Sequence, residues 1–107
     1  MTTALQEWRD AWADYSAKQE LVNAQRKKLY STLSQGDYDE LKKIEPANHE
    51  AYVKCVGKAT QDVIDQLKQE LIDANTGVEG TLFTPTREWY DLWECIHAKP
   101  LLLREAN

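Results

Sequence analysis

A long segment without helix-breaking residues constrains this chain more than any other feature. The first 34 residues contain neither glycine nor proline, and apolar or aromatic residues recur in them every three or four positions. This spacing places the apolar side chains on one face of an α-helix. Thr3 and Gln6 have the spacing of a capping box at a helix start. We therefore predict a helix over residues 3–34, whose apolar face consists of Leu5, Trp8, Trp12, Tyr15, Val22, Leu29 and Leu33.

The middle of the chain predicts two further helices. Gly36 is a residue type that commonly ends a helix, and the acidic residues after it favour a new helix start. A short helix over residues 37–44 would then end at Pro46, because proline lacks the N–H that a helix interior needs. From there a wide apolar stripe predicts a second long helix over residues 47–74.

The last third of the chain predicts a loop, one helix and a tail. Glycine and asparagine residues in the segment 75–84 interrupt the apolar pattern and predict a loop. The Thr-Pro step at its end is a favourable N-cap with proline at the first helical position, which predicts a helix over residues 85–98. Pro100 should end that helix, leaving residues 99–107 as an irregular tail.

These elements predict an all-α fold in a single helical domain of residues 1–107, a usual domain size. The two long helices should pack as an antiparallel hairpin joined by the short connecting helix. The C-terminal helix should then pack at the open end of this small helical bundle, near the start of the first helix.

Four tryptophans are expected to meet at that open end. Trp8 and Trp12 share one helix face, and Trp89 and Trp93 share another, since each pair is four residues apart. One aromatic cluster should result. The sequence leaves open whether it is core or a partly exposed patch for a protein partner.

The far end of the hairpin has no evident cover. One short final helix cannot cover both long helices along their whole length, so the region around Leu29, Leu33 and Tyr52 should stay exposed. We expect self-association there, most simply as a two-fold dimer. The candidate partner-binding residues are Trp8, Trp12, Trp89, Trp93, Leu29 and Leu33.

Charge and hydropathy exclude several classes of partner. The formal net charge is −5 and the only basic cluster is residues 26–28, which argues against nucleic-acid binding. No apolar run approaches the ~20 residues that span a bilayer, and the N-terminus does not resemble a signal peptide. Cys55 and Cys95 are therefore expected to be reduced thiols in a cytoplasmic protein. A disulfide between them is not expected, because the hairpin should place Cys95 closer to Gln66 than to Cys55.

The chemistry-bearing motifs are sparse. Glu94 and His97 form one Glu-x-x-His pair, whereas a di-iron bundle needs two such pairs and two further glutamates. We therefore expect no metal and no cofactor, and Glu94 and His97 are the metal-ligand candidates of this motif. There is no Gly-rich phosphate loop and no catalytic triad spacing.

Two acid pairs motivate an alternative. Asp37 with Glu40, and Glu70 with Asp73, are spaced to hold a divalent ion on a helix face, although the hairpin should put them at opposite ends. The leading hypothesis is a small helical protein-interaction module, such as an adaptor, chaperone, regulator or inhibitor, that acts without catalysis. The alternatives are a divalent-metal-dependent enzyme or small-ligand binder that uses these acids, and an acidic decoy that inhibits a nucleic-acid-binding protein.

Overall fold

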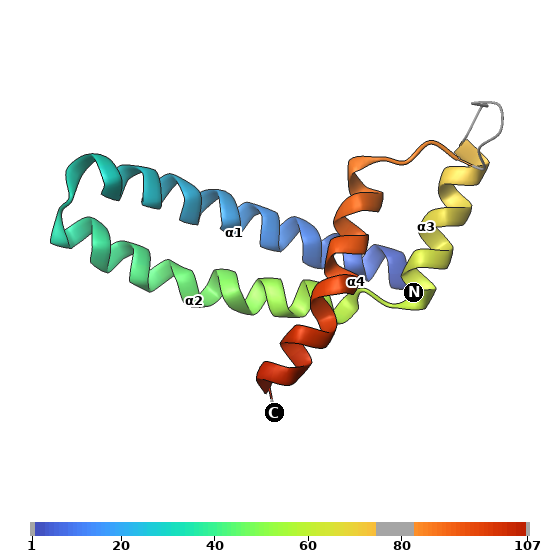
Figure 1. Cartoon of the computed structure of the whole chain (residues 1–107). Helices are drawn as coiled ribbons and strands as arrows, with labels where there is room; N and C mark the ends of the chain where they lie inside the picture. Colours follow the sequence, from blue (N-terminus) through green and yellow to red (C-terminus); the bar gives the residue numbers. More distant parts are fainter. Residues whose placement is uncertain (1, 75–82, 107) are drawn as a thin grey trace.

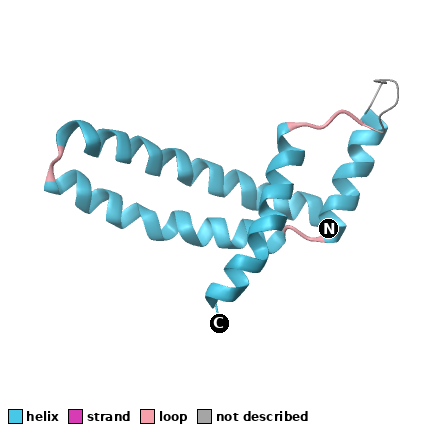
Figure 2. Cartoon of the chain, in the orientation of Figure 1, coloured by secondary structure: helices cyan, strands magenta, loops and turns pink. Residues whose placement is uncertain are grey.

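The computed structural model describes residues 2–74 and 83–106, and its regular elements are four helices. They are α1 (Ala4–Thr32), α2 (Gln35–Lys58), α3 (Gln61–Ala74) and α4 (Arg87–Ala106). Figure 2 shows helices joined by short loops, with no strand in the described part of the chain. The predicted all-α fold is confirmed.

The four helices form two regions, an arm made of the α1–α2 hairpin and a junction where α3 and α4 pack at its open end. α1 and α2 pack along each other as an antiparallel hairpin, and α3 and α4 lie at its open end (Figure 1). The molecule is therefore elongated, with principal extents of 54 × 33 × 27 Å. The predicted hairpin is confirmed, although its second helix has different bounds.

α1 begins where the sequence predicts. The Thr3 hydroxyl accepts a hydrogen bond from the Gln6 backbone N–H at 3.1 Å, which satisfies one of the free amides of the first turn. The Gln6 side chain donates to Asp10 instead of returning to Thr3, so only half of the capping box forms.

The turn between α1 and α2 differs from the prediction. Gly36 does not end the first helix; it lies in the first turn of α2. The residue that ends α1 is Leu33, in the left-handed conformation with φ 51°, and its N–H donates to the Leu29 carbonyl at 2.7 Å. Ser34 then caps α2 by accepting from the Asp37 N–H. The two helices are thus joined by a two-residue turn, and no separate connecting helix exists.

Pro46 does not end a helix either. α2 passes through it, so the predicted helix over 37–44 and the first part of the predicted helix over 47–74 are one element. A proline inside a helix removes one backbone hydrogen bond, but Pro46 is exposed, so water can reach the carbonyl that loses its partner.

The predicted second long helix instead breaks at a corner for which the sequence predicts continuous helix. Ala59 has extended backbone angles and is fully buried, and α3 starts anew at Gln61. Lys99 of α4 donates to the Ala59 carbonyl at 3.2 Å, which satisfies a carbonyl that the broken helix leaves free. The break directs α3 away from the axis of α2 (Figure 1).

α4 is longer than predicted at its C-terminal side. The Thr86 hydroxyl accepts from the backbone N–H of Trp89, one of the free amides of the first turn, so α4 starts at Arg87 instead of residue 85. It continues through Pro100 to Ala106, so the irregular tail predicted for 99–107 is wrong over 99–106. The predicted loop over 75–84 falls mostly on residues 75–82, which lie outside the described residues.

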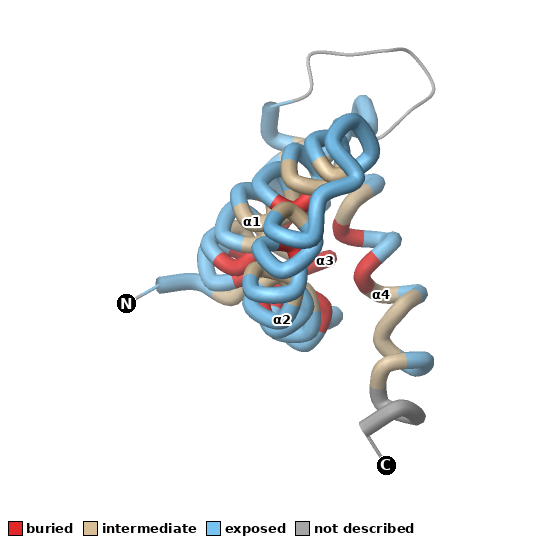
Figure 3. The backbone as a smooth tube through the Cα atoms, turned by 90° about the vertical axis from the view of Figure 1, so that its left-hand side faces the viewer, coloured by how far each residue is buried: buried red, intermediate tan, exposed pale blue. Residues whose placement is uncertain are grey.

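The main core lies at the junction. In Figure 3 the buried positions gather where α1, α2 and α3 meet and on the side of α4 that faces them. Trp8, Leu67 and Leu92 have no exposed surface. All four helices contribute to this core, which consists of Leu5, Trp8, Ala11, Cys55, Val56, Ala59, Val63, Ile64, Leu67, Leu92 and Cys95.

One arginine connects three of the helices at the junction. Arg9 of α1 donates two hydrogen bonds to Glu88 of α4, at 2.9 and 2.7 Å, and two to Glu70 of α3, at 2.6 and 3.4 Å. The bond to Glu88 is the main cause that raises the pKa of Arg9, against the opposing effect of burial. The paired fork geometry fixes the start of α4 beside the start of α1, as predicted.

We expect Arg9→Met to lower the free energy of unfolding by about 1–2 kcal/mol, because it removes a bidentate pair and leaves two carboxylates unpaired. Urea titration followed by circular dichroism measures the change. Lys18→Met is the matched control, since Lys18 makes only a local pair with Asp14 on the surface of α1 and should change stability by less than about 0.5 kcal/mol. Equal losses in the two variants would show that Arg9 does not hold the junction together.

Candidate functional site

The tryptophans lie at the junction but do not form one cluster. Trp8 and Trp12 stack with ring centroids 6.2 Å apart, and Trp89 meets Trp93 edge-on at 5.8 Å. Among the described aromatic side chains no ring contact joins one pair to the other. The four-tryptophan cluster expected from the sequence is therefore not formed: Trp8 lies in the core, Trp12 and Trp89 pack against that core, and Trp93 is partly exposed.

The six predicted partner-binding residues differ in exposure. Trp8 is completely buried, and Trp12, Trp89 and Leu29 are half-buried. Trp93 is 36% exposed, and Leu33 is 81% exposed. Only Trp93 and Leu33 present much of their surface to a partner. Because Trp8 is completely buried, it belongs to the core.

We expect Trp8→Ala to lower the free energy of unfolding by about 3–5 kcal/mol, because it empties a fully enclosed site. Trp93→Ala should lower it by less than about 1 kcal/mol, since that ring is partly solvated. Chemical denaturation of both variants measures the difference. A similar, small loss in both would contradict the assignment of Trp8 to the core.

The tip of the hairpin carries the most exposed apolar surface of the described residues. Tyr30 is 77% exposed and Tyr38 is 44% exposed, next to the 81% of Leu33. A shallow hollow of about 330 Å³ lies among them and is mainly apolar; it is lined by Leu29, Tyr30, Leu33, Ser34, Gln35 and Tyr38. In Figure 3, where the tip faces the viewer, its surface is almost entirely exposed. The expected uncovered end is thus present, but Tyr52 is not part of it: Tyr52 packs on Tyr15 at 5.2 Å.

Hydrogen bonds hold the backbone of the tip in place. The Asp37 carboxylate accepts from the Thr32 hydroxyl, and the Asp37 backbone N–H donates to the Ser34 hydroxyl oxygen. The Asp37 backbone carbonyl accepts from the Gln25 side chain at 2.8 Å. Lys28 pairs with the Asp37 carboxylate at 3.5 Å. The Thr32 hydrogen bond, with Ser34 and Lys28, holds the pKa of Asp37 below its usual range. The exposed apolar residues therefore sit on a well-defined turn.

Asp37 should make the stability of the tip depend on pH. Its pKa is lower in the folded than in the unfolded chain, so its contribution is present above the unfolded value of about 3.9 and is lost as the pH falls through the folded value. We expect Asp37→Asn to lower the thermal midpoint at about pH 6, and we expect the difference from wild type to shrink as the pH falls through the lowered pKa of Asp37. A difference between wild type and variant that stays constant with pH would contradict this role of the carboxylate.

Two cysteines meet at the junction. The sulfur atoms of Cys55 in α2 and Cys95 in α4 are 3.9 Å apart, and both side chains are buried. The expectation that Cys95 lies nearer to Gln66 is wrong, because α2 ends at Lys58 and α3 turns away. Gln66 instead accepts a hydrogen bond from the Leu5 backbone N–H.

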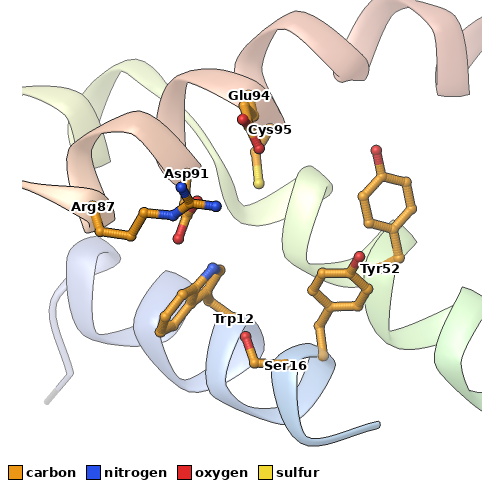
Figure 4. Close-up of a pocket in the computed structure, with 8 residues that line it drawn as sticks. Trp12, Ser16, Tyr52, Arg87, Asp91, Glu94 and Cys95 are labelled. Carbon is orange, nitrogen blue, oxygen red and sulfur yellow. The ribbon is translucent and has the colours of Figure 1, made fainter. Parts of the chain in front are cut away.

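A hollow of about 370 Å³ opens beside the cysteines, between α1, α2 and α4. Figure 4 shows Cys95 pointing from α4 toward it, with the Arg87 guanidinium and the Asp91 carboxylate next to each other at one side. Burial raises the pKa of Asp91, although Arg87 opposes that effect. The hollow is lined by Trp12, Tyr15, Ser16, Tyr52, Arg87, Asp91, Glu94 and Cys95.

The metal-ligand candidates are not brought together. Glu94 lines the hollow in Figure 4, whereas His97 packs edge-on against Trp93 at 6.1 Å. In residues 2–74 and 83–106 no three His, Cys, Asp or Glu side chains gather as metal ligands. No described helix is both long and apolar enough to cross a bilayer.

The two acid pairs lie at opposite ends of the molecule, as expected. Asp37 is bound within the tip, and Glu70 pairs with Arg9 at the junction. Asp73 accepts from Gln69 on its own helix. The pairs therefore do not face a common ion.

Comparison with known proteins finds no family model that matches the chain, and no curated protein or solved structure with significant similarity to it.

Two sets of candidate functional residues were missed at the sequence level. Tyr30 and Tyr38 lie off the apolar seam, and only the Ser34–Asp37 capping spacing signals that a tight turn would bring them together. The contact between Cys55 and Cys95 has no local signal, because it depends on where α2 breaks.

Proposed function

We propose that this protein is a small helical protein-interaction module that acts without catalysis, through the tip of its α1–α2 hairpin. The partner that we propose is a second copy of the chain. The observation that carries the proposal is the conformation and exposure of Leu33.

Leu33 is unfavourable for folding in two respects. A left-handed residue with a Cβ costs roughly 1 kcal/mol, and glycine is the usual choice at this helix-ending position. Its φ is 51°, and its apolar side chain is 81% exposed. The left-handed backbone and the exposed apolar side chain of Leu33 do not stabilise the folded monomer. Both would be accounted for if this side chain inserts into a partner.

The shape of the tip supports a second copy as that partner. The tip offers an exposed leucine and, next to it, an apolar hollow of about 330 Å³. Two-fold symmetry requires the same patch on both subunits, and a patch with both a protrusion and a hollow is self-complementary. Leu33 of each copy would enter the hollow of the other.

The charges around the tip support the same arrangement. The end of α1 carries the exposed bases Lys27 and Lys28, and the first turns of α2 carry the exposed acids Asp39 and Glu40. A two-fold axis through the tip can place the basic end of one α1 beside the acidic start of the other α2. Such complementarity favours association and sets its orientation.

The expected dimer is weak, because a hairpin tip buries less than the roughly 1,200 Å² of a standard interface. Sedimentation velocity over roughly 10–500 µM should show a reversible monomer–dimer equilibrium with a dissociation constant in the micromolar range or above. Leu33→Ala should weaken it at least about tenfold. Leu21→Ala is the matched control, because Leu21 is also exposed on α1 but lies outside the tip, and it should leave the equilibrium unchanged.

Leu33→Gly separates association from folding. We expect it to abolish the dimer while the free energy of unfolding of the monomer stays the same or rises by up to about 1 kcal/mol. A wild-type protein that stays monomeric up to the highest concentration would overturn the second copy as partner. A dimer that is equally sensitive to Leu21→Ala and Leu33→Ala would overturn the tip as the interface.

A further inference from the structure

We propose that Cys55 and Cys95 form a reactive dithiol that a hydroperoxide converts into an intramolecular disulfide between α2 and α4. This site is separate from the hairpin tip, and its test does not depend on self-association.

The two sulfurs are already placed for bond formation. The two sulfur atoms are 3.9 Å apart. Cys55 lies in α2 and Cys95 in α4, so a bond between them would link the two helices directly. A disulfide needs a separation of about 2.05 Å, so the sulfurs must approach by roughly 2 Å, which side-chain rotation and a small shift of α4 can supply. Because both thiols are buried, each meets the other before it meets a cysteine of a second molecule.

The two thiols are not equivalent. Cys95 lines the hollow of about 370 Å³ that opens between α1, α2 and α4, whereas Cys55 has no exposed surface. Figure 4 shows the Cys95 side chain directed toward this hollow. A small oxidant entering from solvent therefore reaches Cys95 first, and Cys55 lies behind it as the resolving thiol.

Trp8 supplies a hydrogen-bond donor that the fold leaves unused. Its buried indole N–H has no hydrogen-bond partner among the nitrogen and oxygen atoms around it. This N–H acts to lower the pKa of the Cys55 and Cys95 thiols, so it favours the ionised form of each. A buried donor without an acceptor is costly, and a developing thiolate would satisfy it.

The electrostatics favour a thiolate on Cys95. A hydrogen bond from the Cys55 thiol lowers the pKa of Cys95, with a further contribution from Trp8, while burial and the carboxylates of Asp91 and Glu94 oppose the shift. The pKa of Cys55 is raised by the same sulfur pair and by burial. The nucleophile is the thiolate, so reactivity concentrates on the thiol with the lower pKa.

The chemistry takes two balanced steps. The Cys95 thiolate attacks one oxygen of hydrogen peroxide, the O–O bond breaks, and the products are a sulfenic acid on Cys95 and hydroxide. The Cys55 sulfur then attacks the Cys95 sulfur, loses its proton and releases the sulfenic oxygen as water. The net reaction oxidises two thiols to one disulfide and reduces one peroxide to two waters.

The product would change how α4 is held. The disulfide would close a long loop through α3 and fix α4 against the end of α2, restricting the unfolded chain. We therefore expect the thermal midpoint of the oxidised protein to exceed that of the reduced protein by roughly 10 °C or more.

The test uses the reduced full-length chain and equimolar hydrogen peroxide. Intact-mass spectrometry should show the loss of two hydrogen atoms in a monomer, and peptide mapping without reductant should find Cys55 joined to Cys95. Cys55→Ala should accumulate a Cys95 sulfenic acid that a dione probe labels. In Cys95→Ala, Cys55 should stay a thiol and label at least about tenfold more slowly, because its side chain has no exposed surface and its pKa is raised by burial.

Trp8→Phe tests the donor, since it keeps an aromatic ring but removes the N–H. We expect the first oxidation step to slow severalfold in a variant that remains folded, with the rate of free cysteine as reference. A wild-type protein whose thiols survive when free cysteine is oxidised, or that forms intermolecular disulfides instead, would overturn the proposal. Equal labelling of the remaining cysteine in the two alanine variants would overturn the assignment of Cys95 as the nucleophile. If a variant fails to fold, peptide mapping of the wild-type protein still tests whether Cys55 and Cys95 form a disulfide.

Discussion

The enclosure of Trp8 is the constraint on which the rest of the fold depends. An indole is too large to be buried by a two-helix hairpin alone, and here it has no exposed surface because α3 and α4 complete the walls around it. The corner at the fully buried Ala59 turns Val63 and Leu67 back toward α1. Arg9, one residue further along α1, then connects the two added helices on the outside of the same site.

The parts of the fold that the sequence predicts correctly are those set by long periodic segments. The apolar seam and the Thr3 cap suffice for the start and the helical character of α1, and hairpin packing follows from two amphipathic helices with a short connection. The errors occur where a single residue was expected to end a helix. Pro46 and Pro100 both lie inside helices, because solvent exposure and packing of the flanking turns offset the loss of one hydrogen bond. Conversely, α2 ends at its C-cap Ala59, two residues after Gly57, where the apolar stripe of the sequence predicts one continuous helix.

The same limits apply to the candidate sites. The sequence predicts an exposed Leu33, because no predicted element covers that end of the hairpin. This prediction does not depend on the precise bounds of the helices. Its left-handed conformation was missed because Gly36 was the more favourable residue for that role. The contact between Cys55 and Cys95 could not be predicted, because it depends on the position of the corner and on the angle of α4. Long-range contacts of this kind follow from tertiary geometry, which local patterns do not encode.

The elongated shape has a consequence for how this protein can change over time. The tip and the junction lie at opposite ends of a molecule 54 Å long, and they share only the regular middle turns of α1 and α2. Effects of substitutions at sites this far apart usually add without coupling. Residues at the tip can therefore be exchanged without disturbing the enclosure of Trp8, so new surface specificities can arise on an unchanged scaffold, in the way that loops vary on a constant framework.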